Sequence, residues 1–190
     1  MQPSTQTSVQ LDFLGDLRRT HSCGQLRPSD VGRRAVLMGW VQRRRDLGSL
    51  IFVDLRDRSG ITQAVFNMEL GREVHARAGQ LRGEFVIAVE GPVVKRSAET
   101  VNSNLETGEV EVSVEKLWLL NESRTPPFPV EEDLSVGEDI RLKYRYVDLR
   151  RPHMQRNLIL RHNINFAVRQ SLNRQGFLEI ETPFMTRSTP

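Results

Sequence analysis

The chain has 190 residues, with 27 lysines and arginines against 24 aspartates and glutamates, which gives a formal net charge of +3. This length suits one substantial domain or two small ones, and the mild positive excess does not by itself demand a nucleic-acid partner. The single cysteine, Cys23, excludes an internal disulfide framework and suits a reducing, cytoplasmic location. The four histidines lack metal-ligand spacing, and no apolar run of about eighteen residues occurs, so neither a metal site nor a membrane span is expected.

Residues 1–19 are expected to form a flexible N-terminal extension, because organised sequence begins near Thr20. The opening residues, MQPSTQTSVQ, lack the charged start and apolar core of a secretory signal.

Three short strands rich in β-branched and aromatic residues are predicted at residues 36–41, 50–55 and 61–66. Three arginines at positions 43–45 lie in the first connection, and residues 57–60 form a tight turn in the second. Because side chains alternate along a strand, Phe52 is expected to face away from the core together with Asp54 and Arg56. An outward aromatic ring that follows three cations suits a single-stranded nucleic acid, whose phosphates pair with the cations while a base stacks on the ring. The alternative is an ordinary exposed phenylalanine beside a solvated loop.

The next segment predicts a helix and the remaining strands of a small barrel. A helix is expected over residues 69–81, ended by Gly83, because apolar residues recur there at helical spacing. Further strands are predicted at residues 85–89, closed by Gly91 and Pro92, at 93–95, and at 110–114 with an extension over 117–120. Three strands, a helix and two more strands are the order of a five-stranded OB-fold barrel, so the fold class is mainly β. An SH3-like barrel would not explain the helix.

The sequence changes character after residue 122. Prolines and an acidic run mark residues 123–152 as a hinge, which ends in the basic helical pattern RLKYRYVDLRRP. A long amphipathic helix follows, carrying Leu160, Ile164, Val168 and Leu172 at four-residue intervals, and residues 177–183 read as a strand. One helix and one strand cannot close a core, so residues 153–190 are expected to open a larger domain, of which this chain holds a fragment.

Three segments carry a family resemblance: GWVQRRRDLGSLIFVDLRDRSGITQAVF, RLKYRYVDLRRP and GFLEIETPFMTRSTP. In this order they resemble the bacterial type of aspartyl-tRNA synthetase, over nearly everything from Thr20 to Pro190. The resemblance implies an OB-fold anticodon-binding domain at residues 20–122, a hinge at 123–152, and the truncated start of a class II α+β catalytic domain at 153–190. That start includes the first class II motif, whose proline is Pro183 and which forms the homodimer interface.

The resemblance also implies which residues contact the anticodon. Phe52 would stack on the middle base and Gln63 would hydrogen-bond it, and a two-residue turn at positions 58–59 makes the two residues diagonal neighbours. The other implied contacts are Arg45 to the third base, Glu111 to the first base, and Arg96 and Asn102 in the matching loop. Without the resemblance, Glu111 would read as a solvated strand edge and Asn102 as a turn residue.

The chain departs from the family pattern at three positions. Val94 stands where a basic residue is expected, and Thr100 stands where an asparagine is expected. Leu47 lies in RRRDLGS, whereas members that also charge the asparagine tRNA resemble RRRDHGG. Leu47 therefore predicts discrimination in favour of the aspartate tRNA.

The parent reaction implied by the resemblance is ATP-dependent attachment of aspartate to tRNA through an aspartyl-adenylate. The family's substrate, ATP and magnesium ligands follow after Pro190, so this chain is expected to hold no catalytic residue, to bind no cofactor and not to aminoacylate alone. Two alternatives remain: a stand-alone OB-fold module that binds single strands without anticodon specificity, and a dimerisation fragment without catalysis.

Overall fold

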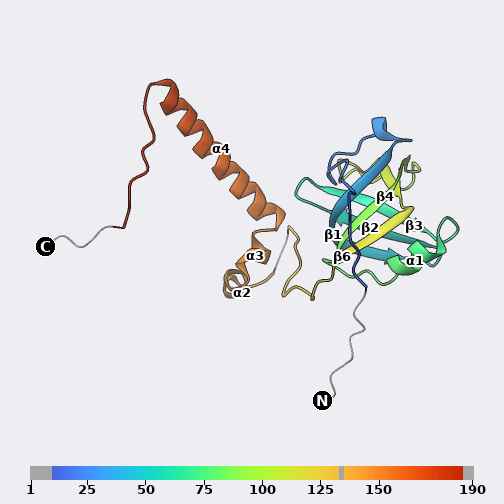
Figure 1. Ribbon diagram of the computed structural model, residues 1–190. Coiled ribbons are helices and arrows are strands. Elements are labelled where there is room, and N and C mark those ends of the chain that lie inside the picture. The colour runs from blue at the N-terminus through green and yellow to red at the C-terminus, as the bar shows by residue number, and fades with distance from the viewer. Residues whose placement is uncertain (1–9, 133–134, 186–190) are drawn as a thin grey trace, which may run out of the picture. The chain divides into compact units, whose positions relative to one another are not determined.

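The computed structural model describes residues 10–132 and 135–185, which divide into two compact units between Thr125 and Pro126. Among the described residues, the first unit holds six strands, one short α-helix and one turn of 3-10 helix, and the second unit holds three α-helices (Figure 1). Five of the strands close into a barrel, because the sheet order β1-β2-β3-β5-β4 returns to β1 through a β1–β4 pairing. The chain therefore has the predicted five-stranded OB-fold barrel, with β6 as an additional strand beside β4.

The strands are β1 (Arg34–Asp46), β2 (Leu50–Arg56), β3 (Ile61–Asn67), β4 (Val86–Lys95), β5 (Val110–Ser113) and β6 (Lys116–Asn121). The core side chains follow the period of a half-buried strand. On β2, Ile51, Val53 and Leu55 are buried, while the alternate side chains Phe52 and Asp54 face the other way. This alternation confirms the orientation predicted for Phe52.

The first strand is longer than predicted. β1 continues through the three arginines, and its end pairs with β2 through Arg45 opposite Phe52. The expectation that the arginines lie in a connection is therefore wrong, because the edge of β2 supplies backbone partners as far as Asp46. Because side chains alternate between the two faces of a strand, Arg44 and Arg45 point to opposite faces of β1.

Strand β4 runs without interruption through Gly91 and Pro92, where two separate strands were expected. Gly91 lies so close to β5 that a Cβ atom there would collide with the backbone carbonyl of Ser113. Glycine thus permits the close approach of two strands rather than ending one of them. The predicted extension at residues 117–120 forms the separate strand β6, which pairs with β4 from Leu119 opposite Ile87 to Lys116 opposite Glu90.

The helix α1 (Arg72–Ala78) is shorter than the predicted range of residues 69–81. It ends at Ala78, followed by Gly79, and not at Gly83. Tertiary packing decides its length: α1 contacts β2, β3 and β6, with Ala78 and the following Leu81 buried in the core.

Part of the N-terminal stretch that was expected to be flexible is bound to the barrel. The backbone N–H of Asp12 donates to the carbonyl of Leu119, and the Asp12 carboxylate accepts a hydrogen bond from the Leu119 N–H at 2.7 Å and pairs with Arg77. Residues 1–9 lie outside the described residues.

The second unit contains α2 (Glu138–Lys143), α3 (Arg145–Asp148) and α4 (Pro152–Arg174). The predicted hinge, residues 123–152, thus includes two helices and a small apolar cluster of Phe128, Val130 and Val147. The fully buried Asp148 accepts a hydrogen bond from Arg151 Nη1 at 3.1 Å. Arg151 also donates to two backbone carbonyls, of Glu131 and Glu132.

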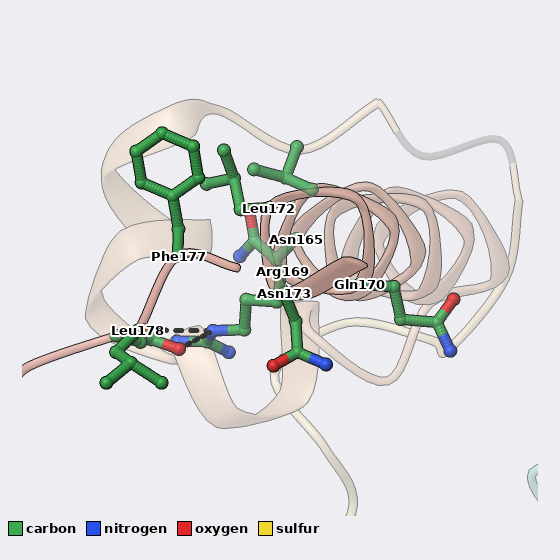
Figure 2. Close-up of a pocket in the computed structure, with 9 residues that line it drawn as sticks. Asn165, Arg169, Gln170, Leu172, Asn173, Phe177 and Leu178 are labelled. Atoms are coloured by element: carbon green, nitrogen blue, oxygen red, sulfur yellow. Dashed lines mark hydrogen bonds and ion pairs between the residues drawn. The ribbon is translucent and has the colours of Figure 1, made fainter. Parts of the chain in front are cut away.

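No strand forms within the described part of residues 177–183, so that prediction is wrong for this chain. A strand needs a neighbouring strand to satisfy its backbone groups, and the residues after Gly176 have none among the described residues. Instead, Arg169 of α4 donates from Nε to Glu179 Oε1 at 3.0 Å, beside a pocket of about 690 Å³ (Figure 2). The α4 side chains Leu160, Ile164 and Val168 are each more than half exposed, as the fragment prediction requires.

Candidate nucleic-acid interface

A pocket of about 600 Å³ opens on the face of the barrel away from the core. The strands β1, β2, β3 and β5 and the loop after β4 all contribute to its wall. Six of the seven predicted anticodon-contacting and discriminating residues line this one pocket: Arg45, Leu47, Phe52, Gln63, Arg96 and Glu111. These residues are distributed over 67 positions of sequence, from 45 to 111, so the closure of the barrel brings them together.

Phe52 and Arg45 form the part of the pocket nearest the end of β1. They are directly opposed across the β1–β2 ladder, and the Arg45 guanidinium carbon lies 5.6 Å from the centre of the Phe52 ring. A cation at this distance from an aromatic face is attracted by the ring quadrupole. The pair offers a base both a stacking surface and a cation with several N–H donors.

Gln63 lines the pocket between Arg45 and Glu111 and is almost fully buried. It pairs with Asp54 across the β2–β3 ladder, while Phe52 pairs with Val65, so Phe52 and Gln63 are diagonal neighbours as predicted. Its Oε1 accepts a hydrogen bond from Arg45 Nη2 at 3.3 Å, and its Nε2 donates to Glu111 Oε2 at 3.3 Å.

Glu111 and Arg96 complete the far side of the pocket. Arg96 Nε lies 3.6 Å from Glu111 Oε2, and the two side chains are only 7% and 19% exposed. Burial raises the pKa of Glu111 above its ordinary value of 4.5, and the positive charge of Arg96 opposes that rise. Among the described residues, the buried Arg96 Nε has no hydrogen-bond partner, so its contact with Glu111 Oε2 is an ion pair and not a hydrogen bond.

Asn102 does not line this pocket. Its backbone N–H donates to the carbonyl of Gly108 and its side-chain Oδ1 accepts from the N–H of Asn104 at 3.1 Å, which makes it a turn residue. The two departures from the family pattern, Val94 and Thr100, do line the pocket.

Six further pocket residues were not predicted to belong to the site: Leu50, Val65, Asn67, Leu70, Ser97 and Ser113. Strand alternation places Ser113 on the same face as Glu111, although it assigns Ser113 no role. Val65 shares the face of Gln63 for the same reason, and its buried side chain gives the pocket an apolar wall beside Phe52. Residues of the loop after β4 carry no comparable signal, because a loop has no fixed period.

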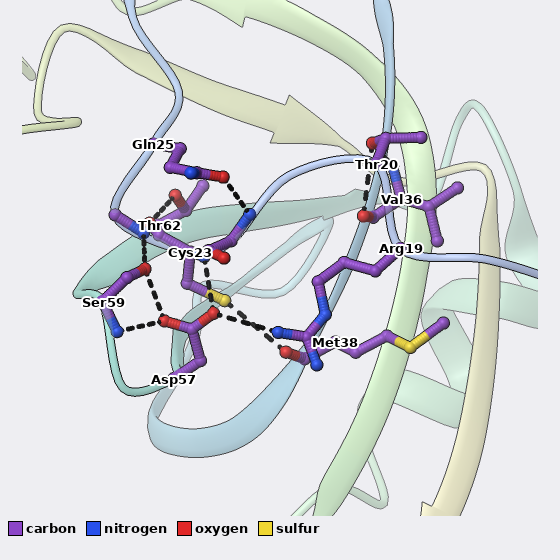
Figure 3. A network of polar contacts seen from close by, with 11 residues as sticks. Arg19, Thr20, Cys23, Gln25, Val36, Met38, Asp57, Ser59 and Thr62 are labelled. Carbon is purple, nitrogen blue, oxygen red and sulfur yellow. Dashed lines mark hydrogen bonds and ion pairs between the residues drawn. The ribbon is translucent and has the colours of Figure 1, made fainter.

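The turn between β2 and β3 is hydrogen-bonded to the segment that precedes the 3-10 helix η1 (Pro28–Asp30), as Figure 3 shows. Asp57 Oδ2 accepts a hydrogen bond from the Cys23 N–H at 2.9 Å, and Asp57 Oδ1 accepts from the Ser59 N–H at 2.7 Å. Ser59 Oγ in turn accepts from the Gly24 N–H at 2.8 Å. Cys23 is fully buried in the hydrophobic core, and burial raises the pKa of its thiol. Its role in this structure is therefore to pack in the core.

Two family models match consecutive parts of this chain. Residues 35–120 match the model of the OB-fold nucleic acid binding domain, and residues 137–190 match the model of class II tRNA synthetases of the D, K and N type. The chain therefore matches, one after the other, the two kinds of domain that these models describe. It is homologous to the aspartate–tRNA ligases over nearly its whole length.

Two curated relatives illustrate the similarity. The aspartate–tRNA(Asp/Asn) ligase of Desulfosudis oleivorans is 57% identical over 180 residues, which cover 95% of this chain and 30% of that protein. The ligase of the same name from Acidobacterium capsulatum is 55% identical, again over 95% of this chain and 30% of that protein. The chain thus spans about 30% of the length of the curated relatives that it matches.

Solved structures agree on the fold. The asparaginyl-tRNA synthetase of Pyrococcus horikoshii complexed with asparaginyl-adenylate has a TM-score of 0.73 and 28% identity, over 88% of this chain and 37% of that one. The aspartyl-tRNA synthetase of Entamoeba histolytica has a TM-score of 0.75 over 96% of this chain and 41% of that one, at 19% identity, and so supports the fold alone.

Across residues 10–132 and 135–185, no group of three or more His, Cys, Asp or Glu side chains is placed to hold a metal ion. In the same ranges, no helix combines the length and apolarity needed to span a membrane.

Proposed function

We propose that this chain supplies the anticodon-reading domain of an aspartate–tRNA ligase. The observation that carries the proposal is the convergence of Arg45, Phe52, Gln63, Arg96 and Glu111 on one pocket. An aromatic ring, an amide, a carboxylate and two guanidiniums provide stacking, donors and acceptors at one site of suitable size for unstacked bases. The partner is therefore a tRNA, bound through its anticodon stem-loop.

Each residue has a role that its chemistry permits. Phe52 stacks on the middle base, and Gln63, beside it, hydrogen-bonds the edge of the same base. Glu111 accepts hydrogen bonds from the first base. A guanine suits this position, because its edge carries N–H donors for the carboxylate. Arg45 contacts the third base, and Arg96 acts from the buried side of the pocket. Asn102 contributes from the loop after β4, outside the pocket lining.

The whole protein would use ATP and magnesium to attach aspartate to the tRNA in the cytoplasm. Since the chain spans about 30% of the length of its curated relatives, we assign no step of that reaction to it and expect the isolated chain not to aminoacylate. This chain contributes affinity and selectivity for the tRNA, which are binding functions.

Leu47 is the residue proposed to discriminate between the aspartate tRNA and the asparagine tRNA. Its side chain is 71% exposed at the rim of the pocket that Arg45 also lines. The curated relatives carry names that include both the aspartate and the asparagine tRNA, whereas Leu47 predicts restriction to the aspartate tRNA. The anticodons GUC and GUU differ only in the third base, so Leu47→His should reduce the preference for GUC over GUU. An unchanged ratio of dissociation constants would remove Leu47 from this role.

The exposed apolar surface of α4 and the residues after it, including Pro183, is the proposed homodimer interface. Phe177, Leu178 and Ile180 are each more than 60% exposed, and apolar surface of this kind is rarely left in water. Size-exclusion chromatography of the full chain beside a chain ending at Thr125 tests this proposal. The full chain should elute at the mass of a dimer and the shorter one as a monomer, and two monomers would argue against the interface.

Titration with anticodon stem-loop RNAs tests the central proposal. The chain should bind a stem-loop with the anticodon GUC more tightly than one whose middle base is changed to adenine, at the same salt concentration. Equal, salt-sensitive binding of both RNAs would instead favour a non-specific single-strand binder, since phosphate contacts carry no sequence information.

A further inference from the structure

Asp54 lies directly beside the pocket, and the roles assigned above do not include it. It stands on β2 with its side chain on the same face as Phe52, and it pairs with Arg43 on one side and Gln63 on the other. Its side chain is 20% exposed, and its Oδ1 lies 3.4 Å from Arg45 Nη2.

The contacts of Arg45 show what this carboxylate does. The same Nη2 that faces Asp54 donates to Gln63 Oε1 at 3.3 Å, and the guanidinium carbon lies over the Phe52 ring. Arginine has a long side chain with many rotamers, so three simultaneous partners confine it far more than one would. Asp54 is the only one of the three that carries a full negative charge.

A carboxylate at this position carries a cost for binding RNA. A negative charge beside the pocket repels the phosphates of any nucleic acid that enters it. A partly exposed ion pair also contributes little to folding stability. Neither affinity nor stability therefore accounts for Asp54, which leaves the orientation of Arg45 as the property that it controls.

We propose that Asp54 is a positioning residue that fixes the Arg45 guanidinium for reading the third anticodon base, so that the protein gains selectivity at the expense of affinity. This inference rests on the proposed function. When Asp54 holds one N–H of Arg45, the remaining donors point in a fixed direction, and a base with the wrong edge leaves them unpaired.

The test compares dissociation constants for stem-loops with the anticodons GUC and GUU in Asp54→Asn, Arg45→Ala and the double variant. Asp54→Asn should bind both RNAs at least as tightly as the unmodified chain, while the GUC-over-GUU ratio falls about three- to tenfold, as expected when one side chain must be ordered on binding. In the Arg45→Ala background, Asp54→Asn should leave the ratio unchanged.

Glu73→Gln is the matched control, because Glu73 is exposed on α1 away from the pocket lining and its removal changes the net charge equally. It should change both affinities alike. Asp54→Ser repeats the test with a smaller side chain, and thermal melting of each variant checks its fold. The positioning role is overturned if Asp54→Asn leaves the GUC-over-GUU ratio unchanged. It is also overturned if Asp54→Asn lowers that ratio equally in the Arg45→Ala background. An unmodified chain that does not distinguish a changed middle base would instead contradict the proposed function.

Discussion

The Gln63 side-chain Nε2 donates a hydrogen bond to Glu111 Oε2 at 3.3 Å, which joins β3 to β5 across 48 positions of sequence. Because the other end of the same amide accepts from Arg45, the amide has one favourable orientation. Rotation by half a turn would set its oxygen against the Glu111 carboxylate and its NH₂ group against the Arg45 cation. The pocket thus presents a fixed donor and acceptor before any RNA arrives, which lowers the entropic cost of binding.

Replacement of Phe52 by alanine should weaken binding of the GUC stem-loop by roughly 1–3 kcal/mol, because a base loses its stacking surface. The dependence of affinity on salt should stay the same, since the ring carries no charge. Titrations at several salt concentrations measure both quantities. Phe13→Ala is the control, as Phe13 is 99% exposed on the N-terminal segment. Equal affinities of the unmodified chain and Phe52→Ala would contradict the stacking role.

Selectivity for guanine at the first anticodon position should depend on pH through Glu111. Its pKa is raised above 4.5 by burial, so as the pH falls the carboxylate is protonated earlier than an exposed glutamate would be. A protonated carboxyl loses acceptor capacity, and the preference for guanine over adenine should therefore decline on acidification. Measuring the preference from pH 7.5 down to pH 4.5, the ordinary pKa of a glutamate, would show this decline. Glu111→Gln should have a small preference that does not vary with pH.

The charge of Arg96 should set the pH at which that decline occurs. Arg96 lowers the pKa of Glu111 in opposition to burial, so Arg96→Met should raise the pKa and move the midpoint of the decline to higher pH. Lys95→Met is the control, since it removes an equal charge at the exposed end of β4. A midpoint that stays in place would show that Arg96 acts on the RNA alone.

Asp57 should stabilise the barrel above about pH 4 and less at lower pH. Burial by itself raises the pKa of Asp57, but hydrogen bonds from Ser59, and from the backbone N–H groups of Cys23 and Gly60, outweigh it and hold the pKa below 3.8. A carboxylate with a lowered pKa contributes stability above its unfolded pKa and loses it as the pH falls through the folded pKa.

Asp57→Asn should therefore reduce the free energy of unfolding by about 1–3 kcal/mol at pH 7, because charged acceptors make the stronger hydrogen bonds. The difference should shrink in strong acid, as the pH falls through the lowered pKa of Asp57 and its carboxylate becomes protonated. Urea unfolding at pH 7 and at a strongly acidic pH measures the difference, with exposed Asp16→Asn as the control. A difference that is the same at both pH values would mean that the charge of Asp57 is not what stabilises the turn.

Local sequence patterns were enough to predict part of this molecule. The alternation of Ile51, Val53 and Leu55 fixed which way Phe52 faces, because strand geometry has a period of two residues. The short turn at residues 57–60 fixed the register that pairs Asp54 with Gln63, because a tight turn leaves one alignment of its strands. Both inferences use neighbours within a dozen residues.

Contacts between distant segments decided the rest. The sequence by itself determined the barrel order, the direction of Phe52 and the residue types that suit an anticodon. Only the tertiary structure decided that β1 extends through Arg45, that Arg96 is buried against Glu111, and that Asn102 forms a turn outside the pocket. The physical reason is that strand length, burial and charge pairing depend on the strand that lies alongside, and barrel closure chooses that strand from far along the chain.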